Sequence, residues 1–534
     1  MEKGIFLLQT MFMILFVFFS IGCDDNTTNI AKVVTLEPDK LNPIRTIDSR
    51  LVSYNVEMTE VTGGTFWKEY SPEQISGKEK ISTDTEISDF SNFSTSNETL
   101  MEYFPPIELA NKKLVKLAKG IGPSWIRVSG TWATKTYYDF DNSTNGIAPE
   151  GFDSVLTESQ WKSVLDFVKA VDGKLLISVA NNDGIHSAKS PWTPEQAKLI
   201  FDYSKNYGVP ISAVEFVNEP NLFEMSGLPK GYTGNDYARD QDIFCKFVRE
   251  NYPETLLVGP CMMMDALMKI YGVELSTVYE TTGMKIADTD EMLENTTEKL
   301  DAFSYHCYSG VSERIMPLNP KWTEKEVLSN EFLAIPKIVA EYYLPFRNKY
   351  IGNGQMWVTE SADAAGGGSS WASTYLDVPR TLNELASFAT VTDGIIFHNT
   401  LASSDYGWLK HTTFDPRPTY FAVVLWNKLM GTTVYDAGEV SEGAYVYAHS
   451  RKDGKDGFAY LIINNSIDGS TEVNIPKSAN VYMLTAKHLR DTKVQLNGKT
   501  LVLDKNDNLP EFKAKEYKAG KIILPPASCT FIIM

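Results

Sequence analysis

The chain is poor in the residues on which metal, thiol and nucleotide chemistry depends. Only 5 of its 534 residues are cysteine and 6 are histidine. The cysteines form no C-x-x-C pair and the histidines no H-E-x-x-H, which are common zinc-site spacings. Neither a G-x-S-x-G turn nor a glycine-rich phosphate loop is present. These absences argue against serine-hydrolase and nucleotide chemistry, and we expect no metal and no cofactor.

Positive charge is also scarce. The 50 lysines and arginines are outnumbered by 68 acidic residues, which gives a net charge of −18. Nucleic acids and other long polyanions need a basic surface, so we do not expect them as partners. The 43% hydrophobic content is that of an ordinary globular protein, and the length allows two or three domains. The 12% aromatic content fits either core packing or platforms for sugar rings.

Residues 1–23 look like a secretion signal rather than part of the fold. A single early lysine, Lys3, precedes a long hydrophobic run that ends in Ser20-Ile21-Gly22-Cys23. Small residues before a lone cysteine resemble the cleavage site of bacterial lipoproteins, in which Cys23 would carry the lipid anchor. An uncleaved membrane anchor is the alternative. In either case we expect the rest of the protein to be exported across the inner membrane, to the periplasm or the cell surface.

The cysteines beyond this signal are expected to be buried thiols. They are Cys245, Cys261, Cys307 and Cys529. A disulfide between Cys245 and Cys261 is the alternative that the spacing leaves open.

From Arg50 onward, short hydrophobic strands alternate with amphipathic helices. The predicted strands cover residues 50–58, 124–130, 174–182, 212–219, 255–262, 300–308, 355–361 and 393–401. Several are hydrophobic along their whole length, as is typical of buried parallel strands. Eight such units predict a (β/α)8 TIM barrel over residues 50–430. A doubly wound sheet is the alternative.

The pattern changes at both ends of this region. Past Gly431 the helices stop, and short strands separated by turn residues predict a β-sandwich over residues 431–534. Residues 24–49 include a strand-like run at 32–36, which we expect to pair with the sandwich. Residues 62–106 are rich in Gly, Ser, Thr and Glu and predict a long loop insertion.

Two glutamates are predicted to lie at the same rim of the barrel. Active sites of TIM barrels lie at the C-terminal ends of their strands. Glu219 follows the fourth strand and Glu360 lies near the end of the seventh. One such glutamate can be a solvated loop residue. Two of them, with His306 and Tyr308 on the strand between, are what glycoside hydrolysis requires.

Two stretches resemble glycoside hydrolase family 79, which comprises β-glucuronidases and heparanase. They are FVNEPNLF around Glu219 and WVTESADAAGGGSS around Glu360. WIRVSGT, SYHCY, DYGWL and FDPRPTYFAVVLWNKLMGT also look like the family, in the same order, so the resemblance covers residues from Arg50 to the C-terminus. Asn-Glu-Pro marks only the wider clan A of glycosidases, whereas a glutamate followed by three glycines is more specific.

The resemblance implies roles for the residues at the barrel rim. Glu219 is the expected general acid/base and Glu360 the nucleophile of a retaining mechanism. Asn218 is expected to bond the sugar 2-hydroxyl, and Tyr308 to orient Glu360. Two further candidates at strand positions are Arg127 on the second strand and His306 on the sixth.

The resemblance also implies how a sugar carboxylate would be held. The backbone amides of Gly366 and Gly367 and the hydroxyl of Tyr406 match the family's carboxylate-binding groups. Glycine N–H groups can approach an anion closely because no side chain intervenes. The alternatives are a flexible linker for the glycines and simple packing for Tyr406.

The implied activity is that of a retaining exo-β-glucuronidase that releases terminal glucuronic acid or its 4-O-methyl form from glycans. Another clan A glycosidase, of β-xylosidase or arabinofuranosidase type, is the first alternative. A surface glycan-binding lipoprotein without activity is the second. The chain departs from the family in two ways. The insertion from Gly64 to Pro106 could wall off the cleft. The basic residues Lys135, Arg314 and Lys410 are expected to be isolated at the rim, unlike a sulfate-binding cluster.

Overall fold

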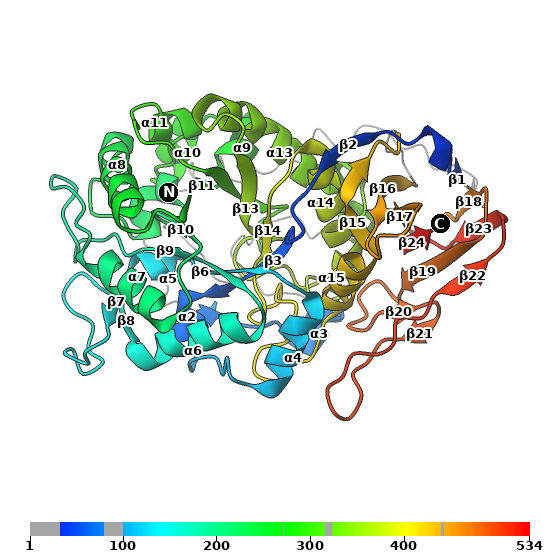
Figure 1. Ribbon diagram of the computed structural model, residues 1–534, viewed down its shortest axis with the longest axis horizontal. Coiled ribbons are helices and arrows are strands. Elements are labelled where there is room, and N and C mark those ends of the chain that lie inside the picture. Colours follow the sequence, from blue (N-terminus) through cyan, green and yellow to red (C-terminus); the bar gives the residue numbers. More distant parts are fainter. Residues whose placement is uncertain (1–31, 80–99, 271, 315–322, 439–442) are drawn as a thin grey trace.

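The computed structural model describes residues 32–79, 100–270, 272–314, 323–438 and 443–534. The signal sequence and Cys23 lie outside the described residues. A barrel of parallel strands and a β-sandwich lie side by side, with the sandwich built largely from the C-terminal residues (Figure 1). In the part of the chain that is described, no helix combines the length and hydrophobicity needed to cross a membrane.

Eight parallel strands close into a barrel. In chain order they are β3 (Val52–Glu57), β6 (Trp125–Ser129), β9 (Lys174–Ser178), β10 (Ala213–Glu215), β11 (Leu256–Met262), β12 (Ala302–Tyr308), β13 (Gln355–Ala362) and β14 (Ile396–His398). The pairing of β14 with β3 completes the circle. The TIM barrel is therefore confirmed, and a doubly wound sheet, which is open, is excluded.

Helices surround the barrel as the alternation predicts. The longer ones are α4 (Lys112–Ile121), α6 (Glu158–Ala170), α7 (Glu195–Tyr207), α8 (Gly234–Asn251), α13 (Asn330–Tyr350), α14 (Asp377–Val391) and α15 (Pro418–Leu429). The shorter ones are η1 (Pro38–Lys40), α2 (Met58–Thr62), α3 (Pro72–Ile75), α5 (Thr131–Thr134), η3 (Pro220–Ser226), α9 (Asp265–Ile270), α10 (Leu275–Thr282), α11 (Thr289–Leu293) and α12 (Glu324–Val327). At the start of α6, Thr157 and Gln160 form the capping box that the sequence predicts.

The barrel interior is filled by hydrophobic side chains below the rim. Seven consecutive strands around the barrel contribute side chains to one cluster. These side chains are Trp125, Leu176, Ala213, Val258, Ala302, Trp357 and Phe397. Above them Arg127 is completely buried. The interior therefore changes from hydrophobic to charged toward the C-terminal ends of the strands, where the site lies.

The sandwich packs two sheets face to face. The larger contains β2 (Pro43–Thr46), β15 (Met430–Tyr435), β16 (Tyr445–Arg451), β17 (Phe458–Ile463), β24 (Cys529–Ile533), β19 (Ala479–Thr485), β20 (Gln495–Leu496), β21 (Lys499–Thr500) and β22 (Lys515–Tyr517). The smaller contains β1 (Lys32–Thr35), β18 (Thr471–Ile475) and β23 (Gly520–Leu524). The N-terminal segment thus adds one strand to each sheet, β1 beside β18 and β2 beside β15.

The barrel and the sandwich are joined through buried polar contacts. The Tyr375 hydroxyl donates to the carbonyl oxygens of Leu484 and Ala527, both at 2.8 Å. The Tyr447 hydroxyl of β16 donates to Asn383 of α14 at 2.7 Å. Helix α14 is buried almost throughout because it lies between the two parts (Figure 1).

Two short ribbons are inserted in the barrel. One pairs β4 (Gly64–Trp67) with β5 (Met101–Phe104) in antiparallel fashion, and the other pairs β7 (Thr136–Asp139) with β8 (Ser154–Thr157). The first lies in the segment predicted as a loop, so that prediction was incomplete. Its strands have only four residues each and are separated by a long stretch of sequence. Four residues are too few for an alternating hydrophobic pattern to be recognised.

Candidate active site

Glu219 lies beyond the end of its strand, in a strained turn. Strand β10 ends at Glu215, four residues before the predicted end. Glu219 then adopts φ 47° and ψ 49°, a left-handed conformation that is costly for a residue other than glycine. Its carbonyl oxygen accepts hydrogen bonds from Leu222 N at 3.0 Å and Ser226 Oγ at 2.6 Å. These bonds hold the turn, and the Glu219 side chain remains 15% exposed.

Glu360 lies near the end of β13 with both oxygens engaged. Arg127 Nη1 donates to Oε1 at 2.9 Å, and the Tyr308 hydroxyl donates to Oε2 at 2.6 Å. Burial opposes ionisation of Glu360. The positive charges of His306 and Arg127 and the Tyr308 hydrogen bond outweigh burial and hold the pKa of Glu360 below its usual value. Glu360 is therefore an ionised carboxylate.

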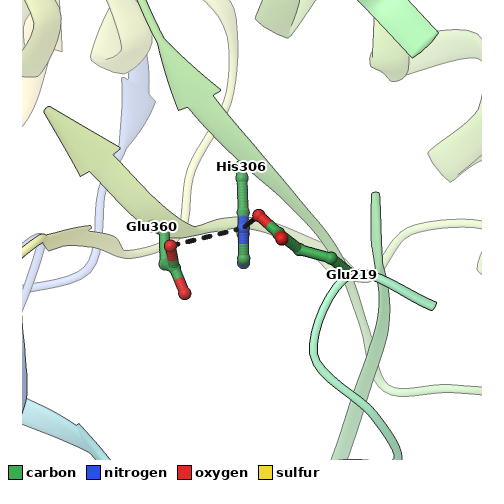
Figure 2. A group of neighbouring side chains, drawn as sticks. All are labelled: Glu219, His306 and Glu360. Carbon is green, nitrogen blue, oxygen red and sulfur yellow. Dashed lines mark hydrogen bonds and ion pairs between the residues drawn. The ribbon is translucent and has the colours of Figure 1, made fainter. Parts of the chain in front are cut away.

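His306 lies between the two glutamates (Figure 2). Its Nδ1 is 2.8 Å from Glu219 Oε1 and 3.6 Å from Glu360 Oε2, and its Nε2 is 3.0 Å from Cys261 Sγ. Burial disfavours the charged imidazole. The Cys261 sulfur, the charge of Glu360 and the hydrogen bond with Glu219 favour it and raise the pKa of His306 well above its usual value. The ring thus holds a proton at hydrogen-bond distance from Glu219.

These three residues also have the spacing of a metal site. Ligand atoms of Glu219, His306 and Glu360 lie within 4.8 Å of one another. Both oxygens of Glu360 already accept hydrogen bonds, and the Arg127 guanidinium lies beside one of them. A metal ion there would face this fixed positive charge, so the contacts of Glu360 do not favour metal binding.

Arg127 connects Glu360 to the end of β10. Its Nε donates to Glu215 Oε2 at 2.8 Å and its Nη2 to Asn218 Oδ1 at 2.8 Å. Burial opposes its charge, but Glu215, Cys261 and Glu360 together raise the pKa of Arg127. Since the Asn218 oxygen is occupied by Arg127, its NH2 group is the one left to donate to a ligand.

Tyr406 is linked to Glu360 through Asn399 and Tyr308. The Asn399 side-chain nitrogen donates to the Tyr406 hydroxyl at 3.2 Å and to the Tyr308 hydroxyl at 3.0 Å. Tyr308 in turn donates to Glu360. The glycine run packs against the same tyrosine, because a Cβ on Gly368 would lie 3.0 Å from the Tyr406 backbone nitrogen. The residues predicted for the carboxylate site therefore lie together.

The glycines of this run need their conformational freedom. Gly366, Gly367 and Gly368 have φ values of 82°, 86° and 86°. Side chains with a Cβ rarely adopt this region, so three successive residues there require glycine. The three glycines have a defined backbone conformation and packed neighbours, which a flexible linker would lack. The linker interpretation is therefore not supported.

Glu57 is a third rim carboxyl that the sequence reasoning missed. It ends β3 and is buried, and its Oε2 has no hydrogen-bond partner among the described residues. Burial, followed by the charge of Glu360, raises the pKa of Glu57 well above its usual value. The rule used for Glu219 and Glu360, a carboxyl at the end of a barrel strand, would have found it.

Arg314 was expected at the rim, apart from any cluster of basic residues, and the structure shows it enclosed in an ion pair. Its side chain is only 6% exposed and forms an ion pair with Asp405 at 2.6 Å. The two residues are 91 positions apart, so their contact could not be predicted from local sequence. Lys135 is partly exposed and pairs with Asp153 at 3.3 Å.

The four described cysteines are buried and free. The buried-thiol prediction is confirmed, and the Cys245–Cys261 disulfide is not formed. Cys261 instead contacts His306.

Curated relatives of the chain include two glucuronidases and several heparanases, although no protein-family model matches it. The hyaluronoglucuronidase of Hirudo nipponia is 24% identical over 471 residues, covering 80% of this chain and 90% of the relative. The baicalin-β-D-glucuronidase of Scutellaria baicalensis is also 24% identical, covering 80% and 84%. Human inactive heparanase-2 is 24% identical over 384 residues, covering 64% and 58%.

Solved structures of glycosidases share the fold. A 4-O-α-L-rhamnosyl-β-D-glucuronidase from Fusarium oxysporum 12S has a TM-score of 0.58 at 13% identity, covering 94% of this chain and all of that one. A GH51 arabinofuranosidase from Xanthomonas axonopodis pv. citri has a TM-score of 0.57 at 13% identity, with the same coverage.

The chain is homologous to the β-glucuronidases and heparanases of glycoside hydrolase family 79, which confirms the resemblance drawn from its motifs. Because inactive heparanase-2 is among the relatives, homology alone does not establish catalysis in this chain.

Proposed function

We propose that the protein is a retaining exo-β-glucuronidase that removes terminal glucuronic acid from glycans. The observation that supports the retaining mechanism is that one oxygen of Glu219 and one of Glu360 lie within 4.8 Å of each other. So short a distance fits the retaining class, whose carboxyl groups are about 5–5.5 Å apart, better than the inverting class, which needs roughly 6.5–9.5 Å to admit a water molecule. The glucuronidases among the relatives support the choice of sugar.

In the first step Glu360 attacks the anomeric carbon while Glu219 protonates the departing oxygen. Glu360 suits the attack because Arg127 and Tyr308 hold it ionised and oriented. The proton for the leaving group lies on the hydrogen bond between His306 Nδ1 and Glu219 Oε1. In the second step Glu219 takes a proton from water, which then hydrolyses the covalent intermediate.

Asn218 can contact the sugar beside Glu360. Its oxygen accepts from Arg127, so its NH2 group can donate to the 2-hydroxyl, a bond that strengthens in the transition state.

A panel of aryl glycosides tests the activity. We expect hydrolysis of the β-glucuronide to exceed that of the matched β-xyloside, α-arabinofuranoside and β-glucoside. A faster xyloside or arabinofuranoside would favour the other clan A activities, and no hydrolysis at all would favour a glycan-binding protein. With glucuronide-capped oligosaccharides, free glucuronic acid as the first product indicates exo action. A parallel 4-O-methyl series tests that preference.

Tyr406 is expected to distinguish glucuronides from glucosides. Its hydroxyl is one of the proposed donors to the sugar carboxylate, which a glucoside lacks. Tyr406→Phe should lower kcat/KM for the glucuronide. The loss should correspond to about 1.5–3 kcal/mol of activation free energy, the value of a charge-assisted hydrogen bond. The weak glucoside activity should hardly change. Equal losses on the two substrates would instead make Tyr406 a packing residue.

Tyr308 is expected to set the acid limb of the pH profile. Its hydrogen bond stabilises ionised Glu360 and helps to lower the pKa of that residue. Tyr308→Phe should raise this pKa, so that kcat/KM begins to fall at a higher pH as the solution is acidified. Tyr305→Phe is a matched control on the same strand, because the Tyr305 hydroxyl bonds to no described residue. An unchanged acid limb in Tyr308→Phe would contradict this role.

We also propose that the protein is exported and anchored through a lipid on Cys23. The support is the hydrophobic run that ends in Ser20-Ile21-Gly22-Cys23. Cys23→Ser should release the protein from membranes in a fractionation experiment. Unchanged partition into membranes would favour an uncleaved anchor.

A further inference from the structure

Arg314 is enclosed against the glycine run that follows β13. Its Nη2 donates to Asp405 Oδ2 at 2.6 Å, and its guanidinium carbon lies 4.0 Å from the centre of the Tyr70 ring. Its Nη1 donates to the Gly366 carbonyl oxygen at 3.4 Å and to Ser404 Oγ at 3.3 Å. A buried carboxylate, an aromatic face and the glycine backbone thus hold the positive charge.

The same contacts determine which side of the glycine run faces the protein. Its carbonyl oxygens accept hydrogen bonds as follows: Gly366 from Arg314 Nη1, Gly367 from Ser404 Oγ at 2.8 Å and Asp405 N at 3.2 Å, and Gly368 from Ser312 Oγ at 2.8 Å. In a trans peptide the N–H points opposite to the preceding C=O. The N–H groups of Gly367 and Gly368 therefore point away from Arg314 and Ser404.

No space separates Arg314 from this backbone. A Cβ on Gly367 would lie 2.2 Å from Arg314 Nη1, 2.5 Å from Trp67 Cβ and 2.6 Å from Ser404 Oγ. The guanidinium and the loop are in direct contact, so a change in one must displace the other.

Part of the enclosure comes from the insertion. Trp67 ends β4, and Tyr70 follows it. The Tyr70 N–H donates to Asp405 Oδ2 at 3.0 Å, and its hydroxyl lies 3.0 Å from Ser312 Oγ. The ribbon that interrupts the barrel after β3 therefore covers the ion pair and the glycine run.

We propose that Arg314 is a positioning residue for recognition of the sugar carboxylate. It holds the glycine run so that Gly367, one of the two donors expected from the sequence, and its neighbour Gly368, which was not expected, present their N–H groups to the carboxylate. This inference rests on the proposed glucuronidase function. Arg314 acts through the loop rather than as a counter-ion, because Asp405 and Tyr70 already occupy its guanidinium. The insertion that carries Tyr70 thereby contributes to sugar specificity.

The test compares aryl β-glucuronide with aryl β-glucoside on the full protein. Arg314→Gln should lower kcat/KM for the glucuronide by about 100-fold, the usual consequence of misplacing a binding group by roughly 1 Å. The glucoside rate should stay within about threefold, because a neutral sugar does not use these N–H groups. Inhibition by glucuronate should weaken in parallel, while inhibition by glucose should not. Arg314→Lys keeps the charge and should recover part of the loss.

Two further variants protect the test against misfolding. Tyr70→Leu removes the aromatic ring that covers the ion pair. It should lower the ratio of kcat/KM for the glucuronide to kcat/KM for the glucoside, but by less than Arg314→Gln does. Arg249→Gln breaks an ion pair with Asp301 on the outer side of the barrel and should leave both substrates unchanged. If wild type prefers the glucuronide but Arg314→Gln and Tyr70→Leu keep that preference, or lose both activities equally, the positioning role is overturned. If wild type does not hydrolyse the glucuronide, the proposed function itself fails.

Discussion

Replacing Glu360 with glutamine should reduce turnover of an aryl glucuronide by on the order of 10⁴-fold or more. An amide cannot form the covalent sugar ester, although it keeps the size of the side chain. Its contacts with Arg127 and Tyr308 would change in part, because the amide nitrogen can only donate. Thermal unfolding of the variant should be compared with wild type so that a loss of fold is recognised.

A smaller residue at the same position gives a sharper version of this test. In Glu360→Gly, azide can enter the space left by the carboxylate and attack the face that Glu360 would attack. The product should then be the α-glucuronyl azide, with inverted configuration. Turnover within about tenfold of wild type in Glu360→Gln, or a β-azide from Glu360→Gly, would contradict the nucleophile assignment.

Glu219→Ala should reduce activity in proportion to how much the leaving group needs a proton. Poor leaving groups such as sugars depend on protonation, whereas activated phenols leave as anions. We therefore expect a loss of about 10²–10⁴-fold on oligosaccharides and a much smaller effect on the first step with an activated aryl glucuronide. Azide should accelerate the variant by attacking the covalent intermediate, giving a product of retained β configuration.

A nearby glutamate provides the control for this experiment. Glu224 lies on η3, five residues after Glu219, and its side chain accepts a hydrogen bond from Gly231 N at 2.9 Å. Glu224→Ala should leave the dependence on leaving group unchanged. An equal loss on both substrates in Glu219→Ala, without azide rescue, would count against an acid/base role.

The features that depend on local pattern could be predicted. The eight barrel strands are short hydrophobic runs, and each is recognisable without knowledge of its partners. Glu219 and Glu360 follow from the rule that chemistry lies at strand ends. Strand β10 ends four residues earlier than predicted. Glu219 still lies at the rim, because the chain continues to it through a turn.

The features that depend on distant contacts could not be predicted. The enclosure of Arg314 is one case, because nothing near it in sequence indicates its contacts with Asp405 and Tyr70. The partners of His306 are a similar case, since Cys261 lies 45 positions earlier. The β4–β5 ribbon was missed because its pairing joins two four-residue strands across a long insertion.

The first sugar released from an aryl β-glucuronide tests the central claim most directly. Its anomeric configuration can be followed by NMR in the first minutes, before the anomers interconvert in solution. A double displacement by Glu360 and Glu219, with oxygens within 4.8 Å of each other, predicts that β-glucuronic acid appears first. If α-glucuronic acid appears first, the enzyme inverts and Glu360 is not the nucleophile. If no glucuronic acid is released, the protein is not a glucuronidase.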